Sequence, residues 1–294
     1  MSIDGIVLVD KPQGPTSHDV VARARRIFNT RKVGHAGTLD PMATGLLVLG
    51  IGRGTRLLGY LAANDKEYVA TMRLGIATDT DDAQGTLIAQ VDASKITDTQ
   101  ILEVVRDYRG HISQRPSSIS AIKIDGKRAY ARVRDGEQIE LPLRDVTVQD
   151  LEITRIAHVP ELNVVDVDVR VVCSAGTYIR ALARDIGEQL GVGGHLTVLR
   201  RTRSGLFSQM VELEQLEKSP EFVPLSQAVR QAFPSVDVPE VDEVRARHGM
   251  RVPSPLEAGS GLNGVFASNG EVIALSENIN NELVPVVVFV HGQQ

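Results

Sequence analysis

One carboxylate, Asp40, lies in a glycine-rich segment whose composition is typical of a functional loop. The segment covers residues 33–47 and has the sequence VGHAGTLDPMATGLL. Gly34 and Gly37 allow backbone conformations that other residues avoid, and Pro41 disfavours a helical conformation at the residue before it. We therefore predict that Asp40 projects from a shaped loop, where a rigid scaffold commonly holds reactive groups. An isolated Asp-Pro pair would indicate only a turn.

The elements that must position this loop are short strands and amphipathic helices. Apolar runs or alternation predict strands, and apolar residues at helical spacing next to capping residues predict helices. The predicted strands are residues 6–9, 46–49, 66–74 and 165–171. One predicted helix is capped by Thr16 or Ser17, the second by Thr97 or Asp98, and the third follows Ser174. The last of these helices carries Tyr178 and Arg180 in its first turn, and Gly191 ends it.

The composition indicates a globular protein without a disulfide or a cysteine metal cluster. The chain has 294 residues with 42% hydrophobic content, which is enough to bury a large core. No apolar stretch approaches the roughly 20 residues that cross a bilayer, and Asp4 and Asp10 stand where a signal peptide would be basic. The single cysteine, Cys173, alternates with apolar residues and is expected in the core. We expect a cytoplasmic protein.

The net charge of −5 is unevenly distributed along the chain. Residues 212–294 hold 5 Lys+Arg against 12 Asp+Glu, so residues 1–211 are slightly positive. Residues 20–39 contain five cations and no acid, and residues 106–134 contain eight cations and two acids. These two clusters are candidate phosphate-binding surfaces, and the alternative for each is a solvated helix face or loop.

An acidic segment, residues 79–85, has the sequence DTDDAQG. A calcium loop of the EF-hand type requires glycine at its sixth position and glutamate at its twelfth, where this chain has Gln84 and Gln90. We interpret the segment as a solvated acidic turn.

The loop around Asp40 resembles the catalytic-aspartate motif of the TruB family, the tRNA pseudouridine-55 synthases. The resemblance extends over most of residues 6–210. The other segments that carry it are residues 9–17, the strand around Tyr68, the basic residues 115–136, residues 174–182 and residues 195–205.

The resemblance implies a role for each matching residue. Asp40 would be the catalytic carboxylate, acting as a nucleophile at the sugar carbon C1′ or as a base that removes a sugar proton, and the sequence leaves both routes open. Arg180 would pair with Asp40, orient it and favour its ionised form. The residues expected to bind the extruded nucleotide are His35, Tyr68, Tyr178, Arg180 and Leu199.

The resemblance also implies a fold. We expect an α+β protein with a mixed or antiparallel pseudouridine-synthase sheet flanked by helices. Residues 1–235 would form the catalytic domain, with a thumb-like RNA-binding insertion at about 115–144, and residues 236–294 a small PUA-like β-barrel. The acidity of the last segment argues against strong RNA binding there.

The implied activity is the isomerisation of uridine 55 in the T-loop of tRNA to pseudouridine. It requires no cofactor and no metal. The implied partner is the tRNA T-stem-loop. The resemblance further implies a monomeric enzyme that acts without a membrane and without an obligate protein partner. One alternative is a non-catalytic chaperone that folds tRNA with the same surface. Another is a glycoside hydrolase with paired carboxylates, which is disfavoured because no second acid occurs in a comparable loop motif.

Overall fold

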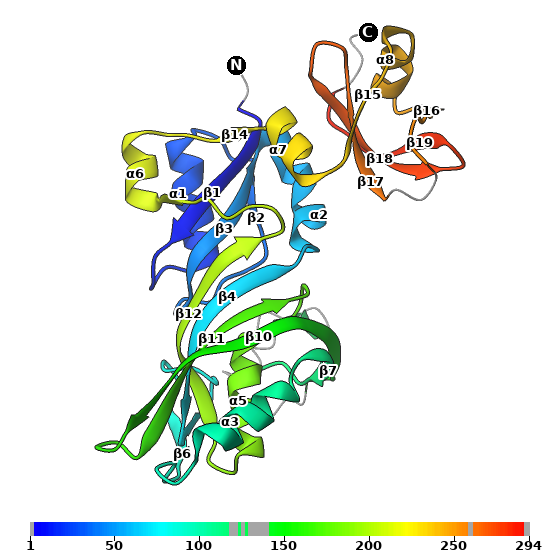
Figure 1. Ribbon diagram of the computed structural model, residues 1–294. Helices are drawn as coiled ribbons and strands as arrows, with labels where there is room; N and C mark the ends of the chain where they lie inside the picture. The colour runs from blue at the N-terminus through cyan, green and yellow to red at the C-terminus, as the bar shows by residue number, and fades with distance from the viewer. Residues whose placement is uncertain (1–2, 118–122, 125–126, 129–140, 258–260, 291–294) are drawn as a thin grey trace. The chain divides into compact units, whose positions relative to one another are not determined.

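The computed structural model describes residues 3–117, 123–124, 127–128, 141–257 and 261–290. The chain forms two compact units, each assembled from separate stretches of sequence. Unit 1 contains Met1–Leu39, Leu46–Ala62 and Gly205–Gln294, and unit 2 contains Asp40–Gly45 and Ala63–Ser204. Both units combine strands and helices, which confirms the predicted α+β class (Figure 1).

Unit 2 is built on a mixed sheet with the strand order β12-β4-β11-β10-β7 (Figure 1). These strands are β4 (Lys66–Leu74), β7 (Gly110–Gln114), β10 (Arg144–Val159), β11 (Val164–Cys173) and β12 (Gly194–Ser204). Neighbours in this order are antiparallel. Strand β12 also pairs in parallel with Thr44 and Gly45, the first residues of β3 (Thr44–Ile51). The predicted strands at 66–74 and 165–171 are confirmed.

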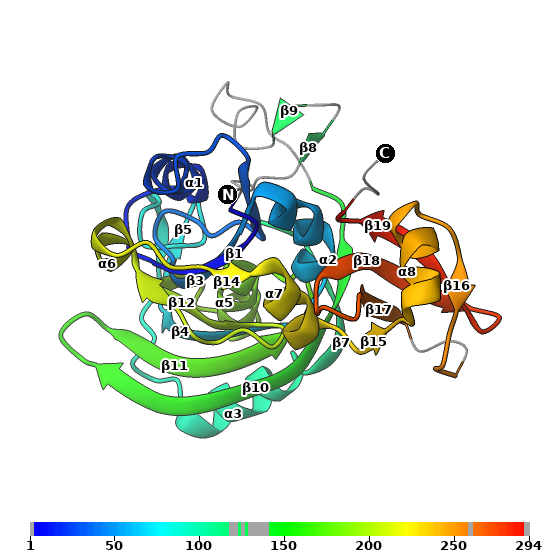
Figure 2. The ribbon, with the colours of Figure 1, turned by 90° about the horizontal axis from the view of Figure 1, so that it is seen from above.

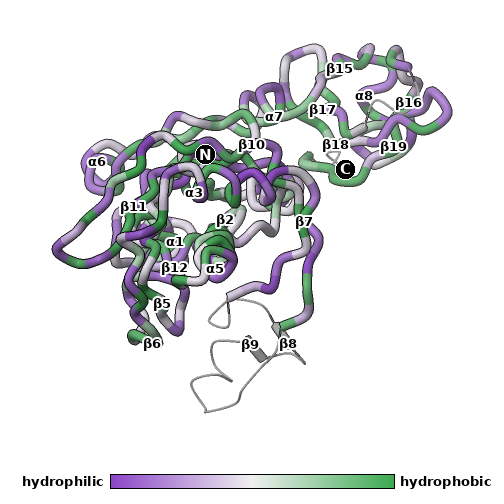
Figure 3. Tube along the Cα trace, turned by 60° about the horizontal axis from the view of Figure 1, so that its bottom comes forward, coloured by the Kyte–Doolittle hydropathy of each residue, from purple (hydrophilic) through white to green (hydrophobic). Residues whose placement is uncertain are grey.

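One face of this sheet is buried and the other is polar. In β4 the buried positions alternate with more exposed ones, and in β11 valines alternate with charged residues. In Figure 3 the trace of β11 carries both hydrophilic and hydrophobic colours. On the polar face Arg73 pairs with Asp166 at 2.7 Å. Such one-sided burial is typical of antiparallel sheets.

Helices α3 (Asp98–Arg106) and α5 (Ile179–Gln189) cover this sheet (Figure 2). Helix α5 packs on β12 and β4, and α3 packs on β10 and on α5. Thr97 caps α3 with a complete capping box, which satisfies amide groups that the first turn leaves unpaired. The predicted helix after Ser174 is confirmed, because Ile179, Leu182 and Ile186 form its buried stripe. A hairpin of β5 (Ile76–Thr78) and β6 (Leu87–Gln90) holds the acidic segment between its strands.

Unit 1 contains a second group of strands and helices. The strands are β1 (Gly5–Lys11), β2 (Val33–Ala36), the rest of β3, β13 (Val211–Glu212) and β14 (Val223–Pro224). The helices are α1 (Ser17–Ile27), the 3-10 helix η1 (Gly52–Leu57), α2 (Leu58–Ala62), α6 (Leu213–Lys218) and α7 (Leu225–Ala232). Thr16 and Asp19 form the capping box of α1, so the predicted start of this helix is confirmed.

The last part of unit 1 is a five-stranded sheet with the order β15-β17-β18-β19-β16. Its elements are β15 (Ser235–Asp237), α8 (Glu240–Arg247), β16 (Val252–Pro253), β17 (Leu262–Phe266), β18 (Val272–Ile279) and β19 (Glu282–Val288). Residues 236–294, for which the resemblance implies a small β-barrel, therefore contain the short strands of this sheet.

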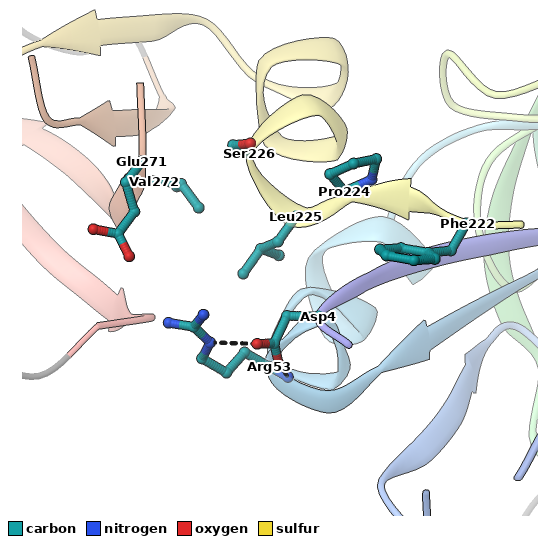
Figure 4. Close-up of a pocket in the computed structure, with 8 residues that line it drawn as sticks. All are labelled: Asp4, Arg53, Phe222, Pro224, Leu225, Ser226, Glu271 and Val272. Atoms are coloured by element: carbon teal, nitrogen blue, oxygen red, sulfur yellow. Dashed lines mark hydrogen bonds and ion pairs between the residues drawn. The ribbon is translucent and has the colours of Figure 1, made fainter. Parts of the chain in front are cut away.

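Helices η1 and α7 connect this sheet to the rest of unit 1. Phe266 and Phe289 share a buried cluster with Val229 of α7. Arg53 of η1 donates to Asp4 from Nε at 2.9 Å and to the Phe289 carbonyl oxygen from Nη1 at 3.3 Å. Figure 4 shows Arg53 and Asp4 beside a pocket of about 290 Å³ that Glu271 also lines.

Most of the basic insertion predicted at 115–144 lies outside the described residues. Within it, β8 (Lys123–Ile124) pairs with β9 (Lys127–Arg128) in antiparallel fashion. No helix in the described part of the chain is long and apolar enough to cross a membrane.

Candidate active site

Asp40 and Arg180 form an ion pair in unit 2. Arg180 Nε lies 3.0 Å from Asp40 Oδ2. The Asp40 side chain is 36% exposed, whereas that of Arg180 is 5% exposed. The carboxylate is therefore accessible, and the cation that orients it is buried in the protein.

The backbone around Asp40 is shaped as the sequence predicts. Gly37 has φ +84° and Gly45 has φ +94°, a region that side chains with a Cβ rarely adopt. The Asp40 carbonyl oxygen accepts a hydrogen bond from the Ala43 amide at 3.1 Å. These contacts make a tight turn at the start of β3.

Arg180 is itself held by the acidic segment between β5 and β6. Its Nη1 donates to the Thr80 carbonyl oxygen at 2.7 Å and lies 3.5 Å from Asp82 Oδ2. The Asp82 side chain is only 7% exposed. One guanidinium thus joins an accessible carboxylate to a buried one.

The interpretation of residues 79–85 as a solvated turn was wrong, because Asp81 and Asp82 are buried. The physical reason is non-local. The Leu196 amide donates to the Asp81 carbonyl oxygen at 3.0 Å, and the Ala83 amide donates to the Leu196 carbonyl oxygen at 2.9 Å. These bonds fold the turn onto the sheet, where arginines of α5 compensate its charge. Asp82 is a residue of this candidate site that the sequence did not indicate.

Tyr68 and Leu199 lie on the buried face of the same sheet. Tyr68 is opposite Arg201 in the β4–β12 ladder, and Leu199 is opposite Ala70. Both Tyr68 and Leu199 are less than 10% exposed. Burial raises the pKa of the Tyr68 phenol, and the negative charge of Asp40 contributes in the same direction. The phenol therefore remains neutral at physiological pH.

Tyr178 is the N-cap residue of α5 and immediately precedes the helix that carries Arg180. Tyr178 is partly exposed. Tyr178, Tyr68, Leu199, Arg180 and Asp40 all belong to unit 2.

His35 belongs to unit 1, where it is part of β2. Its ring packs edge-on against His18 with the centroids 5.4 Å apart. Arg23, in the cationic cluster of residues 20–39, donates from Nε to Glu217 at 3.0 Å, and Arg25 donates to the Val33 carbonyl oxygen at 3.2 Å. Two of the five cations of this cluster thus have partners inside the protein.

The site can perform carboxylate chemistry. An ionised, oriented carboxylate can attack an electrophilic carbon or remove a proton. Asp82 is buried and directed to Arg180, so it stabilises the guanidinium and does not form a second accessible acid of the kind that hydrolases require. In the described part of the chain, no group of three or more His, Cys, Asp or Glu side chains could hold a metal ion.

Comparisons with known proteins agree with this fold. The model of the TruB family pseudouridylate synthase N-terminal domain matches residues 25–179, and that of the tRNA pseudouridylate synthase B C-terminal domain matches residues 180–229. A tRNA pseudouridine synthase B of Thermobifida fusca is 52% identical over 290 residues, which cover 97% of this chain and 98% of that protein. A protein of the same name from Mycobacterium sp. (strain KMS) is 51% identical over 291 residues, covering 97% and 96%.

Solved structures show the same fold. A chain of a Cbf5-Nop10-Gar1 complex is similar with a TM-score of 0.72 and 30% identity, covering 98% of this chain and 85% of that chain. A chain of an H/ACA RNP bound to a substrate RNA containing 2′-deoxyuridine has a TM-score of 0.72 and 27% identity, covering 97% and 85%. Fold and site therefore define a pseudouridine synthase. The chain belongs to the TruB family of pseudouridylate synthases, which confirms both the resemblance and the predicted isomerase class.

Proposed function

We propose that the protein converts uridine 55 in the T-loop of tRNA to pseudouridine, with Asp40 as the reacting carboxylate. The observation that carries this proposal is the accessible Asp40 carboxylate held at 3.0 Å by the buried Arg180 guanidinium. Relatives about half identical over nearly the whole chain bear the name tRNA pseudouridine synthase B, which supports tRNA as the substrate. Because the substrate is a tRNA, we place the enzyme in the cytoplasm.

The reaction rearranges one nucleoside without consuming another reagent. The N1–C1′ bond breaks, the uracil turns, a C5–C1′ bond forms, C5 loses its proton and N1 gains one. Asp40 acts either as a nucleophile that bonds to C1′ and is later displaced, or as a base that removes a sugar proton to give a glycal-like intermediate. Both routes need an ionised carboxylate next to the sugar. Neither route requires a cofactor.

The target uridine must leave its stack to reach Asp40. Extrusion of a base costs a few kcal/mol of free energy. Stacking of the extruded base on an aromatic side chain contributes roughly 1–3 kcal/mol per base and offsets part of this cost. We assign this contact to Tyr68, with Tyr178 and Leu199 beside the base and Arg180 orienting Asp40. His35 would contact the substrate from β2.

The remaining chain would bind the rest of the tRNA. We assign residues 1–235 to the catalytic domain and the cations of the 115–144 insertion to the RNA backbone, and residues 236–294 to a PUA-like domain. One similar solved structure contains a substrate RNA, which supports RNA as the ligand of this fold. We propose a monomer that needs no protein partner.

The test uses an unmodified tRNA transcript and maps pseudouridine by position after chemical labelling and mass spectrometry. Wild-type protein should modify position 55 alone. Asp40→Asn should bind the tRNA with a Kd within about threefold of wild type and form no product, because an amide can neither attack C1′ nor accept the proton. Asp92→Asn, which changes an exposed aspartate of unit 2, is the matched control and should react normally.

Two results would overturn the proposal. Substantial product from Asp40→Asn would remove the catalytic role of Asp40. Absence of pseudouridine with wild-type protein, together with faster tRNA refolding in the presence of either protein, would instead establish the non-catalytic chaperone.

A further inference from the structure

Gln114, the last residue of β7, holds the residue that begins α5. Its Oε1 accepts a hydrogen bond from the Tyr178 amide at 3.1 Å, and its Nε2 donates to the Tyr178 carbonyl oxygen at 3.3 Å. Gln114 is 1% exposed. The Tyr178 side chain does not cap α5. The buried Gln114 amide contacts both backbone groups of this N-cap residue, and the Tyr178 carbonyl oxygen also accepts the first intrahelical bond from the Leu182 amide at 3.2 Å.

Arg184 makes a second link from the same helix. It follows Arg180 by one helical turn and therefore lies on the same face of α5. Its Nη2 donates to the Arg115 carbonyl oxygen at 2.7 Å, and its Nη1 lies 3.1 Å from Asp81 Oδ2. Arg115 directly follows Gln114, so both links join α5 to the residues where the basic insertion begins.

The two arginines of α5 contact two adjacent aspartates. Arg180 contacts Asp82, and Arg184 contacts Asp81. Asp81 has φ +58°, an unusual conformation for a residue with a side chain, and it changes the direction of the chain between the two carboxylates. The Leu196 amide fixes this turn by donating to the Asp81 carbonyl oxygen at 3.0 Å. The turn and the helix are thus joined by two neighbouring ion pairs, one of which continues to Asp40.

We propose that Gln114 and Arg184 are positioning residues for pseudouridine formation. They fix the first two turns of α5, and with them Tyr178 and Arg180, to the residues that begin the basic insertion. The inference rests on the proposed function, because it assigns Arg180 to the orientation of Asp40. A displacement of about 1 Å in a reacting group can cost about a hundredfold in rate, so contacts that set the position of α5 control the chemical step without touching the substrate.

Two conservative variants test this role. Gln114→Glu keeps the size and the acceptor but places a carboxylate oxygen against the Tyr178 carbonyl oxygen. Arg184→Lys keeps the charge beside Asp81, but a single ammonium group does not reproduce the geometry in which two guanidinium nitrogens contact Asp81 and the Arg115 carbonyl oxygen separately. The matched controls are Gln90→Glu, whose exposed amide also donates to a backbone oxygen, and Arg155→Lys, whose side chain is 71% exposed.

The measurements are the single-turnover rate of pseudouridine formation at saturating enzyme and the Kd for unmodified tRNA. Each test variant should lower the rate on the order of ten- to a hundredfold and change the Kd by less than about threefold, whereas the controls should leave both unchanged. Combining Gln114→Glu with Arg180→Lys should slow the reaction by less than the product of the two single effects, because both act through α5. If Gln114→Glu does not fold, Gln114→Met has similar length, introduces no charge and takes its place.

The inference is overturned if both test variants react at the wild-type rate while Asp40→Asn stays inactive. It is also overturned if they lose tRNA affinity at an unchanged rate, because the residues would then serve binding alone. Product from Asp40→Asn is a different outcome and contradicts the proposed function instead.

Discussion

Asp40 and Asp82 share one guanidinium, that of Arg180, with separations of 3.0 Å to Nε and 3.5 Å to Nη1. The two carboxylates differ in exposure, at 36% for Asp40 and 7% for Asp82. The buried carboxylate holds the arginine, and the arginine orients the accessible carboxylate. The site therefore combines one accessible carboxylate with two buried groups that hold it in place.

Arg180→Lys should lower the single-turnover rate of pseudouridine formation by about a hundredfold, because lysine presents a point charge that cannot bridge both carboxylates. Asp82→Asn should lower it roughly tenfold, since it removes the charge opposite Arg180 but leaves an oxygen that can accept. The tRNA Kd should stay within about threefold in both variants. A wild-type rate in Asp82→Asn would show that the orientation of Asp40 does not depend on the buried carboxylate.

Gly45 should tolerate no side chain. It has φ +94°, and a Cβ there would lie 2.2 Å from the Arg201 carbonyl oxygen. Gly45→Ala would break the pairing of β3 with β12 next to Asp40, so we expect a loss of more than about 2 kcal/mol in the free energy of unfolding and a loss of activity. Urea unfolding followed by circular dichroism measures this.

Gly59→Ala is the control for that substitution. Gly59 is in α2, has no neighbour within 4 Å of a new Cβ, and alanine favours helices over glycine by about 1 kcal/mol. Gly59→Ala should therefore be neutral or stabilising. Equal effects of the two substitutions would contradict the steric argument.

Local features of the fold could be predicted from the sequence, and non-local ones could not. The capping roles of Thr16 and Thr97 could be predicted, because a capping box depends only on residues three positions apart in the sequence. The burial of Asp82 depends on Leu196, which is more than a hundred residues away in the sequence. The sequence around Asp82 shows only acidic neighbours, and these indicated a surface turn. The cationic cluster of residues 20–39 was a candidate phosphate-binding surface or a solvated face, and the sequence could not show that Arg23 contacts Glu217, which lies 194 residues further along the chain.

The candidate site shows the same division. Asp40, Tyr68, Arg180 and Leu199 were recognised from segments that each resemble a family motif. Asp82 carries no comparable motif of its own, and only its distance to Arg180 identifies it. The spacing of Arg180 and Arg184 on one helix face was a usable signal, since two arginines beside a buried stripe require acidic partners.

Asp4→Asn should weaken the attachment of η1 in unit 1. The Asp4 side chain is 9% exposed, and it accepts from the Arg53 amide at 2.5 Å and from Arg53 Nε at 2.9 Å. Charge-assisted hydrogen bonds contribute about 1.5–3 kcal/mol, so the free energy of unfolding of unit 1 should fall by about that amount. Urea unfolding with limited proteolysis measures this free energy.

Asp237→Asn is the control. It removes the charge from an exposed ion pair with Arg230 and should lower the free energy of unfolding by less than about 1 kcal/mol. A loss in Asp237→Asn equal to that in Asp4→Asn would contradict the prediction.

Lys66 gives the stability of the protein a distinct pH dependence. Burial, and to a smaller extent the charge of Arg201, lowers the pKa of Lys66 to about 8, whereas in the unfolded chain this pKa has its ordinary value of 10.5. Between these two values the unfolded chain binds a proton that the native protein has released. The free energy of unfolding therefore rises with pH in this window, because the native protein no longer carries a buried charge.

Comparison with Lys66→Met isolates this effect. The stability difference, wild type minus variant, should be constant below pH 8, shift in favour of wild type between about pH 8 and pH 10.5, and become constant again above it. Urea unfolding at pH 7.5, 9 and 10 measures the difference, and the exposed Lys95→Met serves as the control. A difference that stays flat or shifts toward the variant across this window would show that the native protein keeps Lys66 protonated, and that its contact with the Asn64 carbonyl oxygen at 2.5 Å compensates for burial.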